Sequence, residues 1–105
     1  MQYLRLKKQS DFQKIFKKGR RVFSSSLTML VVPYSTMRMG ISIGKKHGKS
    51  VVRNRVKRLL REAFRLTADE MKGKYAIVLI PKVSEKYAFD TFKRQLLWII
   101  KKENL

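Results

Sequence analysis

The chain has 105 residues, enough for one domain, and its 26 Lys and Arg against 7 Asp and Glu give a formal net charge of +19. A hydrophobic share of 44% beside 31% charged residues is typical of globular proteins and excludes a disordered chain. The lack of cysteine excludes disulfides and cysteine-ligated zinc, and no apolar run approaches the roughly 20 residues of a membrane span or resembles a signal peptide. The missing signal peptide and membrane span lead us to expect a cytoplasmic location. Because this charge costs the folded state self-repulsion, we expect a polyanionic partner. Nucleic acid is the leading partner, and an anionic membrane surface is the second.

The first part of the chain predicts a helix. Residues 1–8 are basic and are expected to be irregular. Ser10 then suits the N-cap of a helix that Gly19 is placed to end. Three apolar residues recur on one face of this helix, at Phe12, Ile15 and Phe16. This spacing indicates that the helix packs on a core through that face.

Three short strands are predicted next, at Val22–Phe23, Leu27–Val32 and Arg38–Ile43. Successive side chains of a strand point to opposite faces of its sheet, so the middle strand has two distinct faces. Its odd-numbered positions are uniformly apolar. The even-numbered positions are less so, and we expect them on the open side of the sheet: Thr28, Leu30 and Val32.

The second half of the chain predicts a long helix, a strand and a final helix. A basic loop precedes Ser50, which suits the N-cap of a helix over about residues 51–70. The nearly continuous apolar run Tyr75–Ile80 predicts a central strand that is covered on both faces. The last helix spans about residues 88–102, and Trp98 falls on the side opposite its apolar face.

These elements give the order α-β-β-β-α-β-α, which predicts an α+β sandwich in a single domain over residues 1–105, with four strands in its sheet. A strand, the long helix and the last strand form a βαβ-like unit. The general preference of such units predicts a right-handed crossover.

The stretch from Lys45 to Arg65 is both cationic and amphipathic. It holds nine Lys or Arg residues and one acid, Glu62. On a helical wheel, one sector is apolar, and it contains Val52, Val56, Leu59, Leu60 and Ala63. The opposite sector is basic, whereas a merely solvated helix mixes charge signs to limit repulsion.

Arginine predominates on this helix and suits forked hydrogen bonding to phosphate, and the helix N-terminus adds free amides. Asn54 adds a group that both donates and accepts, while Arg55 lies at the boundary with the apolar sector. The candidate RNA-binding residues are therefore Lys45, Lys46, Lys49, Arg53, Asn54, Arg55, Lys57, Arg58, Arg61 and Arg65.

No catalytic or metal-binding constellation is evident in the sequence. The seven acids have no motif spacing, and His47 is the one histidine. Because His47 stands between glycines and lysines in the basic loop, we expect it to contact phosphate or to be exposed rather than to act as a general base. The loop lacks the spacing of a Walker P-loop.

The run Arg53–Arg65, RNRVKRLLREAFR, closely resembles the RNR helix of the bacterial ribonuclease P protein component. Asp11–Gly19 resembles the first helix of that family, and Gly40–Lys46 resembles its third strand and the basic loop after it. Size and element order agree as well, so the resemblance covers nearly the whole chain. It implies a ribosomal S5 domain 2-like fold with a left-handed crossover through the long helix, in place of the right-handed one that base rates favour.

The resemblance also implies a function in tRNA processing. The family provides the protein subunit of a ribonucleoprotein endonuclease, a hydrolase that removes the 5′ leader of precursor tRNA. Catalysis belongs to the RNA subunit and to Mg²⁺ bound chiefly by the RNA and the substrate. The basic helix and loop are expected to bind the catalytic RNA. A central cleft is expected to bind the leader, through Phe12, Phe16, Thr28 and Leu30.

One residue departs from the family pattern, because relatives can carry an aromatic where Leu30 aligns, and leucine cannot stack in the same way. Three rival interpretations stay open on the sequence. The first is a structural RNA-binding protein, such as a ribosomal component. The second is a self-sufficient nuclease, and the third is a cationic helix at a membrane surface, although its apolar residues are needed for a core.

Overall fold

The computed structural model describes residues 3–105. Its helices are α1 (Gln9–Lys18), α2 (Ser50–Thr67) and α3 (Phe89–Lys102). Two short 3₁₀ turns flank α2, with η1 (Lys45–His47) before it and η2 (Ala68–Glu70) directly after it. Its strands are β1 (Leu4–Arg5), β2 (Arg20–Phe23), β3 (Leu27–Pro33), β4 (Arg38–Ile41) and β5 (Tyr75–Pro81). They form one sheet in the order β1-β4-β5-β3-β2, so the predicted α+β architecture is confirmed.

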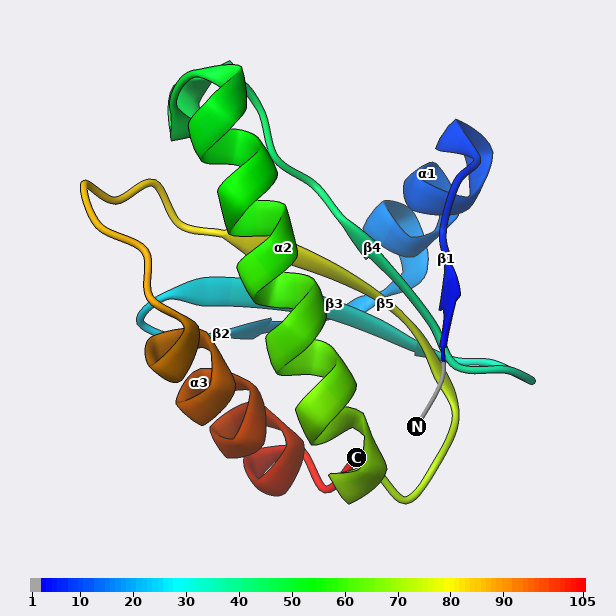
Figure 1. Cartoon of the computed structure of the whole chain (residues 1–105). Helices are drawn as coiled ribbons and strands as arrows, with labels where there is room; N and C mark the ends of the chain where they lie inside the picture. Colours follow the sequence, from blue (N-terminus) through cyan, green and yellow to red (C-terminus); the bar gives the residue numbers. More distant parts are fainter. Residues whose placement is uncertain (1–2) are drawn as a thin grey trace.

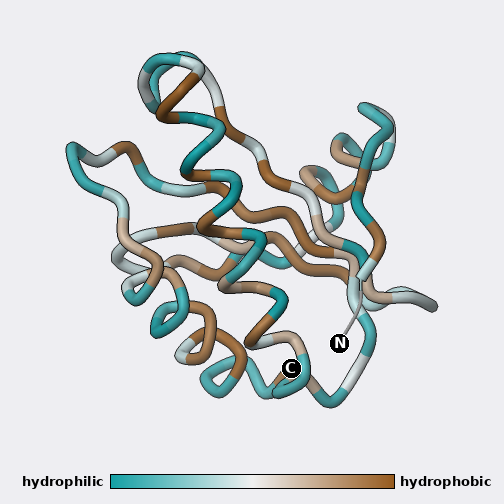
Figure 2. Tube along the Cα trace, in the orientation of Figure 1, coloured by the Kyte–Doolittle hydropathy of each residue, from teal (hydrophilic) through white to brown (hydrophobic). Residues whose placement is uncertain are grey.

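The sheet separates two unequal layers of helix. α2 and α3 lie side by side on one face, and α1 lies alone on the other (Figure 1). The strands through the middle of the molecule are the most continuously hydrophobic part of the chain (Figure 2). The larger core cluster lies beneath α2 and α3, and a smaller one of five buried residues lies beneath α1, formed by Leu6, Ile15, Leu30, Ala76 and Val78.

β5 is the central strand of the sheet. It pairs antiparallel with β3 and parallel with β4, and its side chains alternate between the two core clusters. Ile77 and Leu79 belong to the larger cluster, whereas Ala76 and Val78 belong to the smaller one. The double coverage predicted from its apolar run is therefore confirmed.

β3 divides its side chains between the same two clusters. Leu27, Met29 and Val31 are buried in the larger cluster, as the alternation predicts, while Leu30 and Val32 belong to the side that faces α1. The expectation that the even-numbered face is open is wrong in part. Leu30 is 0% exposed and Thr28 is 9% exposed, because α1 covers this part of the sheet.

The segment before α1 is the main correction to the predicted topology. β1 makes a fifth, two-residue strand parallel to β4, where we expected irregular chain and four strands. The Leu4 amide donates to the Met37 carbonyl at 3.0 Å, and the Leu6 amide donates to the Met39 carbonyl at 3.1 Å. Two residues are too few to show a strand period, which is why the sequence pattern does not reveal this edge.

Both predicted serine caps are also wrong. Lys8 and Lys49 occupy the N-cap positions of α1 and α2, with no side-chain capping bond, and each serine lies inside the first turn. The predicted end of α1 at Gly19 is confirmed, since Gly19 is its C-cap. β4 ends at Ile41, two residues earlier than the predicted strand.

α2 packs on the sheet through the predicted apolar sector. Val56, Leu60 and Ala63 are 0% exposed, and Phe64 joins them as the largest fully buried side chain. α2 connects the adjacent parallel strands β4 and β5, as predicted for a βαβ-like unit. The left hand of this crossover stays a prediction. Because its inner side is fixed against the core, the opposite side of α2 faces solvent.

Candidate nucleic-acid interface

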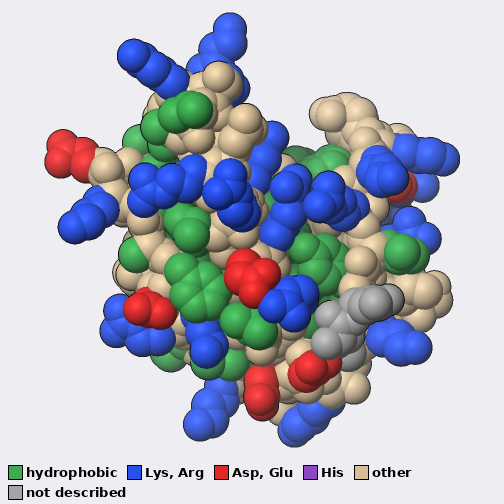
Figure 3. All heavy atoms as spheres, in the orientation of Figure 1, with side chains coloured by type: hydrophobic (Ala, Val, Ile, Leu, Met, Phe, Trp, Pro, Cys, Tyr) green, Lys and Arg blue, Asp and Glu red, His purple; other side chains and the backbone are tan. Residues whose placement is uncertain are grey.

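The outward side of α2 presents its cations to solvent. We call it the basic face, and it consists of Arg53, Asn54, Lys57, Arg58, Arg61 and Arg65. Asn54, Arg58 and Arg65 are exposed, and the other three are half-buried. Lys and Arg side chains form a band across this side of the molecule, over α2 and toward β1 (Figure 3). The wheel prediction, apolar side inward and cations outward, is confirmed.

Glu62 and Arg65 form an ion pair on the basic face. The Arg65 Nε–H donates to Glu62 Oε2 at 3.3 Å, and a second bond joins Arg65 Nη2 to Glu62 Oε1. The hydrogen bond from Arg65 lowers the pKa of the Glu62 carboxyl, and the same pair raises the pKa of Arg65. Glu62 is the one acid in α2, so most of the positive charge of this helix is left for an external anion.

Arg55 lies at the edge of α2, as its wheel position predicts. Its Nη2 donates to the backbone carbonyl of Tyr87 at 3.3 Å, in the segment that leads into α3. Arg55 is nevertheless exposed, and a guanidinium has five N–H donors. It therefore joins α2 to that segment while other donors stay accessible.

The expectation that His47 contacts phosphate or is exposed is wrong. His47 is 4% exposed, and its Nε2 lies 2.7 Å from the buried Pro81 carbonyl at the end of β5. Since a carbonyl only accepts, we assign the proton to Nε2, which leaves Nδ1 to accept the Gly44 amide at 3.1 Å. These contacts of the imidazole fix the 3₁₀ turn, so that the loop is held by His47 while its lysines, Lys45, Lys46 and Lys49, stay exposed.

The four residues expected to line a leader cleft are not all accessible: two are half-buried and two are buried. Phe12 and Phe16 are half-buried and pack against the smaller core cluster. A Cβ at Gly40 would collide with the Phe12 ring, so this strand position needs glycine for the ring to lie on its backbone. The burial of Thr28 and Leu30 leaves little of either side chain available for contact.

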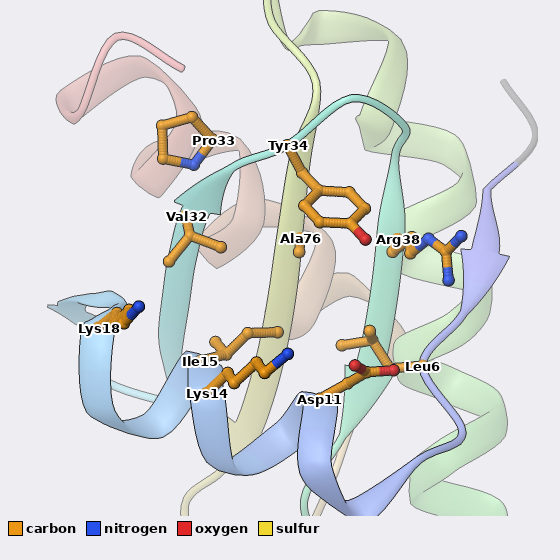
Figure 4. A pocket seen from close by; sticks show the side chains of 10 residues that line it. All are labelled: Leu6, Asp11, Lys14, Ile15, Lys18, Val32, Pro33, Tyr34, Arg38 and Ala76. Carbon is orange, nitrogen blue, oxygen red and sulfur yellow. The ribbon is translucent and has the colours of Figure 1, made fainter.

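The open space beside α1 lies instead at the end of β3. A pocket of about 280 Å³ is bounded by α1, by the start of β5 and by the turn after β3. Its floor is apolar, and four residues that the sequence analysis did not select surround it: Lys14, Lys18, Tyr34 and Arg38 (Figure 4). Tyr34 lies between the predicted strands Leu27–Val32 and Arg38–Ile43. An aromatic directly after Pro33, between two strands, is the signal that could have identified it.

A smaller hollow links the two surfaces at the sheet edge. It has a volume of about 100 Å³, and Lys57 and Arg61 of the basic face meet Arg5 of β1 and the Phe12 ring there. The cations of α2 therefore continue around the edge of the sheet toward α1.

Residues 3–105 lack the features of two other classes of site. No helix in this range is long and apolar enough to cross a membrane. Nor does the range contain a group of three or more His, Asp or Glu side chains placed to hold a metal ion.

These features define a class: a small, strongly basic α+β protein that presents arginines and lysines to solvent from one helix and the loop before it. Comparison with known proteins identifies the family. The family model described as Ribonuclease P matches residues 1–104 of the chain. The chain belongs to this family, whose members are protein subunits of bacterial ribonuclease P, a ribonucleoprotein endoribonuclease.

Individual relatives agree with this assignment. The ribonuclease P protein component of Clostridioides difficile is 46% identical over 91 residues, which cover 84% of this chain and 78% of the relative. The RNase P protein of Thermotoga maritima has a TM-score of 0.82 at 31% identity, covering 93% of this chain and 96% of the other. A Staphylococcus aureus RNase P protein mutant with defective mRNA degradation activity has a TM-score of 0.82 at 29% identity, covering 95% and 87%.

Proposed function

We propose that this protein binds the RNA subunit of ribonuclease P and the 5′ leader of precursor tRNA, and thereby promotes removal of the leader in the bacterial cytoplasm. The observation that carries the proposal is the basic face of α2, together with the lysines of the preceding loop. The RNA subunit supplies the catalytic centre, and the protein supplies binding energy and neutralises phosphates.

The basic face and loop are the proposed contact with the RNA subunit. Arginine forks match phosphate oxygens, and the half-buried stems of Arg53, Lys57 and Arg61 restrict how far these side chains move. Asn54, exposed between them, is suited to a sugar hydroxyl or a base edge. This surface lies on the α2 side of the sheet, so the α1 side stays free for the leader.

Magnesium is expected to bind to RNA rather than to this protein. Mg²⁺ prefers carboxylate, water and phosphate oxygens in octahedral geometry. Within residues 3–105 the side chains offer no cluster of three such ligands. We propose that the protein acts on the metal indirectly, because cations that reduce phosphate repulsion allow the RNA to fold around its own Mg²⁺.

Reconstitution tests the proposal directly. The protein is mixed with the RNA subunit and precursor tRNA at a low magnesium concentration, and 5′ cleavage is measured against the RNA subunit alone. We expect stimulated cleavage at the mature 5′ end and tighter binding of precursor than of mature tRNA. A protein that binds both tRNAs equally would instead favour a purely structural RNA-binding role.

Salt dependence tests the electrostatic part. Each neutralised phosphate releases counterion, so the logarithm of the association constant should fall linearly with the logarithm of the salt concentration. A response that is flat in salt would exclude the basic face as the main contact.

A second candidate function comes from the Staphylococcus aureus mutant, which is defective in mRNA degradation activity. We propose mRNA as a second substrate of this chain. The test uses purified protein without the RNA subunit. Cleavage of mRNA by the protein alone would support the rival interpretation of a self-sufficient nuclease. Cleavage only with the RNA subunit present would leave catalysis with that RNA.

A further inference from the structure

The outward side of α3 carries an exposed tryptophan. Trp98 is 47% exposed, and it is the one tryptophan in the chain. The prediction that it lies opposite the apolar face of this helix is confirmed. That face is already buried in the core, and it consists of Phe92, Leu96, Ile99 and Ile100. Tryptophan is highly buried on average in folded proteins, and packing of the core does not account for this indole.

Exposed cations surround this indole on the helix surface. Arg94 lies one turn before Trp98, and Lys101 and Lys102 lie one turn after it. Residues at these spacings are neighbours on the surface of a helix. The Lys102 Nζ lies 4.6 Å from the centroid of the Trp98 ring, within the range of a cation–π contact. We call these four residues the α3 patch.

The two acids of this segment lie at the margins of the α3 patch. Asp90 belongs to the first turn of α3, one turn from Arg94 but two turns from the indole. Glu103 is half-buried, and its Oε1 lies 3.4 Å from the Nε of Arg20 in β2. Neither carboxylate is at a spacing that makes it a neighbour of Trp98 on the helix surface. The positive charge beside the ring is therefore available to an external anion.

We propose that the α3 patch is a second contact for the RNA subunit of ribonuclease P, in which an unpaired base stacks on Trp98 and the three cations hold the phosphates beside that base. An exposed aromatic ring among cations is the combination that binds unpaired nucleotides, because every base has a face that can stack. The inference rests on the proposed function. It adds a contact outside both the basic face of α2 and the pocket beside α1.

The position of α3 favours the RNA subunit over the leader as the source of this base. α2 and α3 lie side by side on one face of the sheet, and α1 lies on the other (Figure 1). Packed helices are about 8–10 Å apart, so an RNA that binds the basic face of α2 needs to extend by only about one helix to reach α3. Arg55 adds an exposed cation on the way, since it donates to the Tyr87 carbonyl in the segment that leads into α3.

Other partners match the α3 patch less well. A helix that lies in a membrane surface needs a free apolar face, whereas the apolar face of α3 is buried in the core. A second copy of the chain is disfavoured because each copy carries a net charge of +19. An acidic protein would satisfy the cations, but it would not need a flat ring among them. RNA satisfies the ring and the cations together.

The first test uses the fluorescence of the complete protein. Because the chain has one tryptophan, its emission reports on the α3 patch. We expect the RNA subunit to quench and shift this emission in step with binding, which a gel mobility shift measures independently. Anionic lipid vesicles and polyglutamate should leave the emission unchanged. Binding of the RNA subunit with unchanged emission would overturn the inference, and so would a response to vesicles or polyglutamate that equals the response to RNA.

The second test compares the affinities of three variants for the RNA subunit. Trp98→Leu removes the ring and should weaken binding by about five- to thirty-fold, the effect of losing one stacked base. Trp98→Phe keeps a smaller ring and should recover part of this loss. Phe23→Leu is the matched control, because Phe23 is an aromatic of β2 that is 61% exposed and lies outside the α3 patch. Thermal unfolding of each variant confirms that it is folded. Equal affinities of Trp98→Leu and Phe23→Leu would overturn the inference.

A third measurement separates this inference from the proposed function. The ratio of the affinities for precursor and mature tRNA is measured with holoenzyme that is saturated with each variant. We expect Trp98→Leu to leave this ratio unchanged, and a lower ratio would assign the patch to the leader and overturn the inference. If the RNA subunit binds through Trp98 but 5′ cleavage is not stimulated, the proposed function fails and the α3 contact stands. Stimulated cleavage with no response at Trp98 would have the opposite meaning.

Discussion

The basic face of α2 and the pocket beside α1 offer RNA two different environments. The basic face is a convex helix surface with many cations and no apolar floor. The pocket is concave, with an apolar floor, one aromatic wall and three cations. A surface of the first kind is suited to phosphate wherever it is presented, whereas a pocket of the second kind is suited to a flat group that is not already stacked.

The two environments differ because of the layers beneath them. α2 is held by the larger core cluster and shares its face of the sheet with α3, so its outer side can carry many charges without loosening the fold. α1 lies alone on a cluster of five buried residues, and it does not cover its face completely. The pocket is the part of the sheet that a ten-residue helix leaves uncovered.

Among substitutions that distinguish the two surfaces, Ile15→Ala should have the largest effect on stability. Ile15 is 4% exposed and is the buried anchor of α1, so the truncation should lower the free energy of unfolding by about 2–5 kcal/mol. Chemical denaturation measures this loss. Below the lowered unfolding transition, discrimination between precursor and mature tRNA should weaken while binding to the RNA subunit persists. Equal loss of both activities would show that the two surfaces are not separable.

His47→Ala should have the next largest effect, and on the opposite surface. It leaves the buried Pro81 carbonyl and the Gly44 amide without their imidazole partner, at a cost of about 1–3 kcal/mol. We expect faster hydrogen exchange in residues 44–49 and weaker binding to the RNA subunit. Lys46→Ala is the control, since it removes an exposed charge and should not change the exchange of the loop.

Arg58→Ala should change RNA binding without changing stability. Arg58 is exposed on the basic face, so the free energy of unfolding should stay within about 0.5 kcal/mol. Assembly with the RNA subunit should weaken, and the slope of its salt dependence should fall by about one. Lys82→Ala, at an exposed position after β5, is the charge-matched control. Unchanged assembly with lost cleavage would instead indicate a catalytic role for Arg58.

Glu62→Gln should have the smallest effect and the opposite sign. Removing this carboxylate frees Arg65, which now donates to it twice. We expect slightly tighter binding to the RNA subunit, by less than the loss caused by Arg58→Ala, and a slightly steeper salt dependence. Because Arg65 lowers the pKa of Glu62, the carboxylate stays ionised throughout the neutral range in which binding is measured. Tighter binding at low salt that disappears at high salt would confirm an electrostatic origin.

The sequence predicted the elements with strong periodicity and missed those without it. The amphipathic wheel of α2 and the apolar run of β5 each span several residues, and both are found where expected. β1 has two residues and no pattern, so only its backbone pairing with β4 reveals it. The serine caps failed because Ser10 and Ser50 suit a cap by type, while the backbone turns into the helix one residue or more before them.

The site was predictable where it depends on charge, and not where it depends on packing. The basic face follows from the order of the residues alone. The burial of His47 does not, since its partner at Pro81 is 34 residues away in sequence. Tyr34 was missed for a similar reason, because its neighbours come from α1, β4 and β5 and meet only in the folded sheet.

The central place of β5 has a consequence for how the chain acquires its structure. β5 is the last strand in sequence, yet it pairs with both β3 and β4. Until residues 75–81 have left the ribosome, the β2–β3 hairpin and β4 have no common partner. Both core clusters also lack the side chains that β5 contributes to them. During synthesis at about 5–20 residues per second, the emerging chain therefore passes several seconds with unpaired strand edges beside a highly charged helix. We expect its folding to be late and cooperative, with the repulsion among the cations of α2 delaying collapse until β5 arrives.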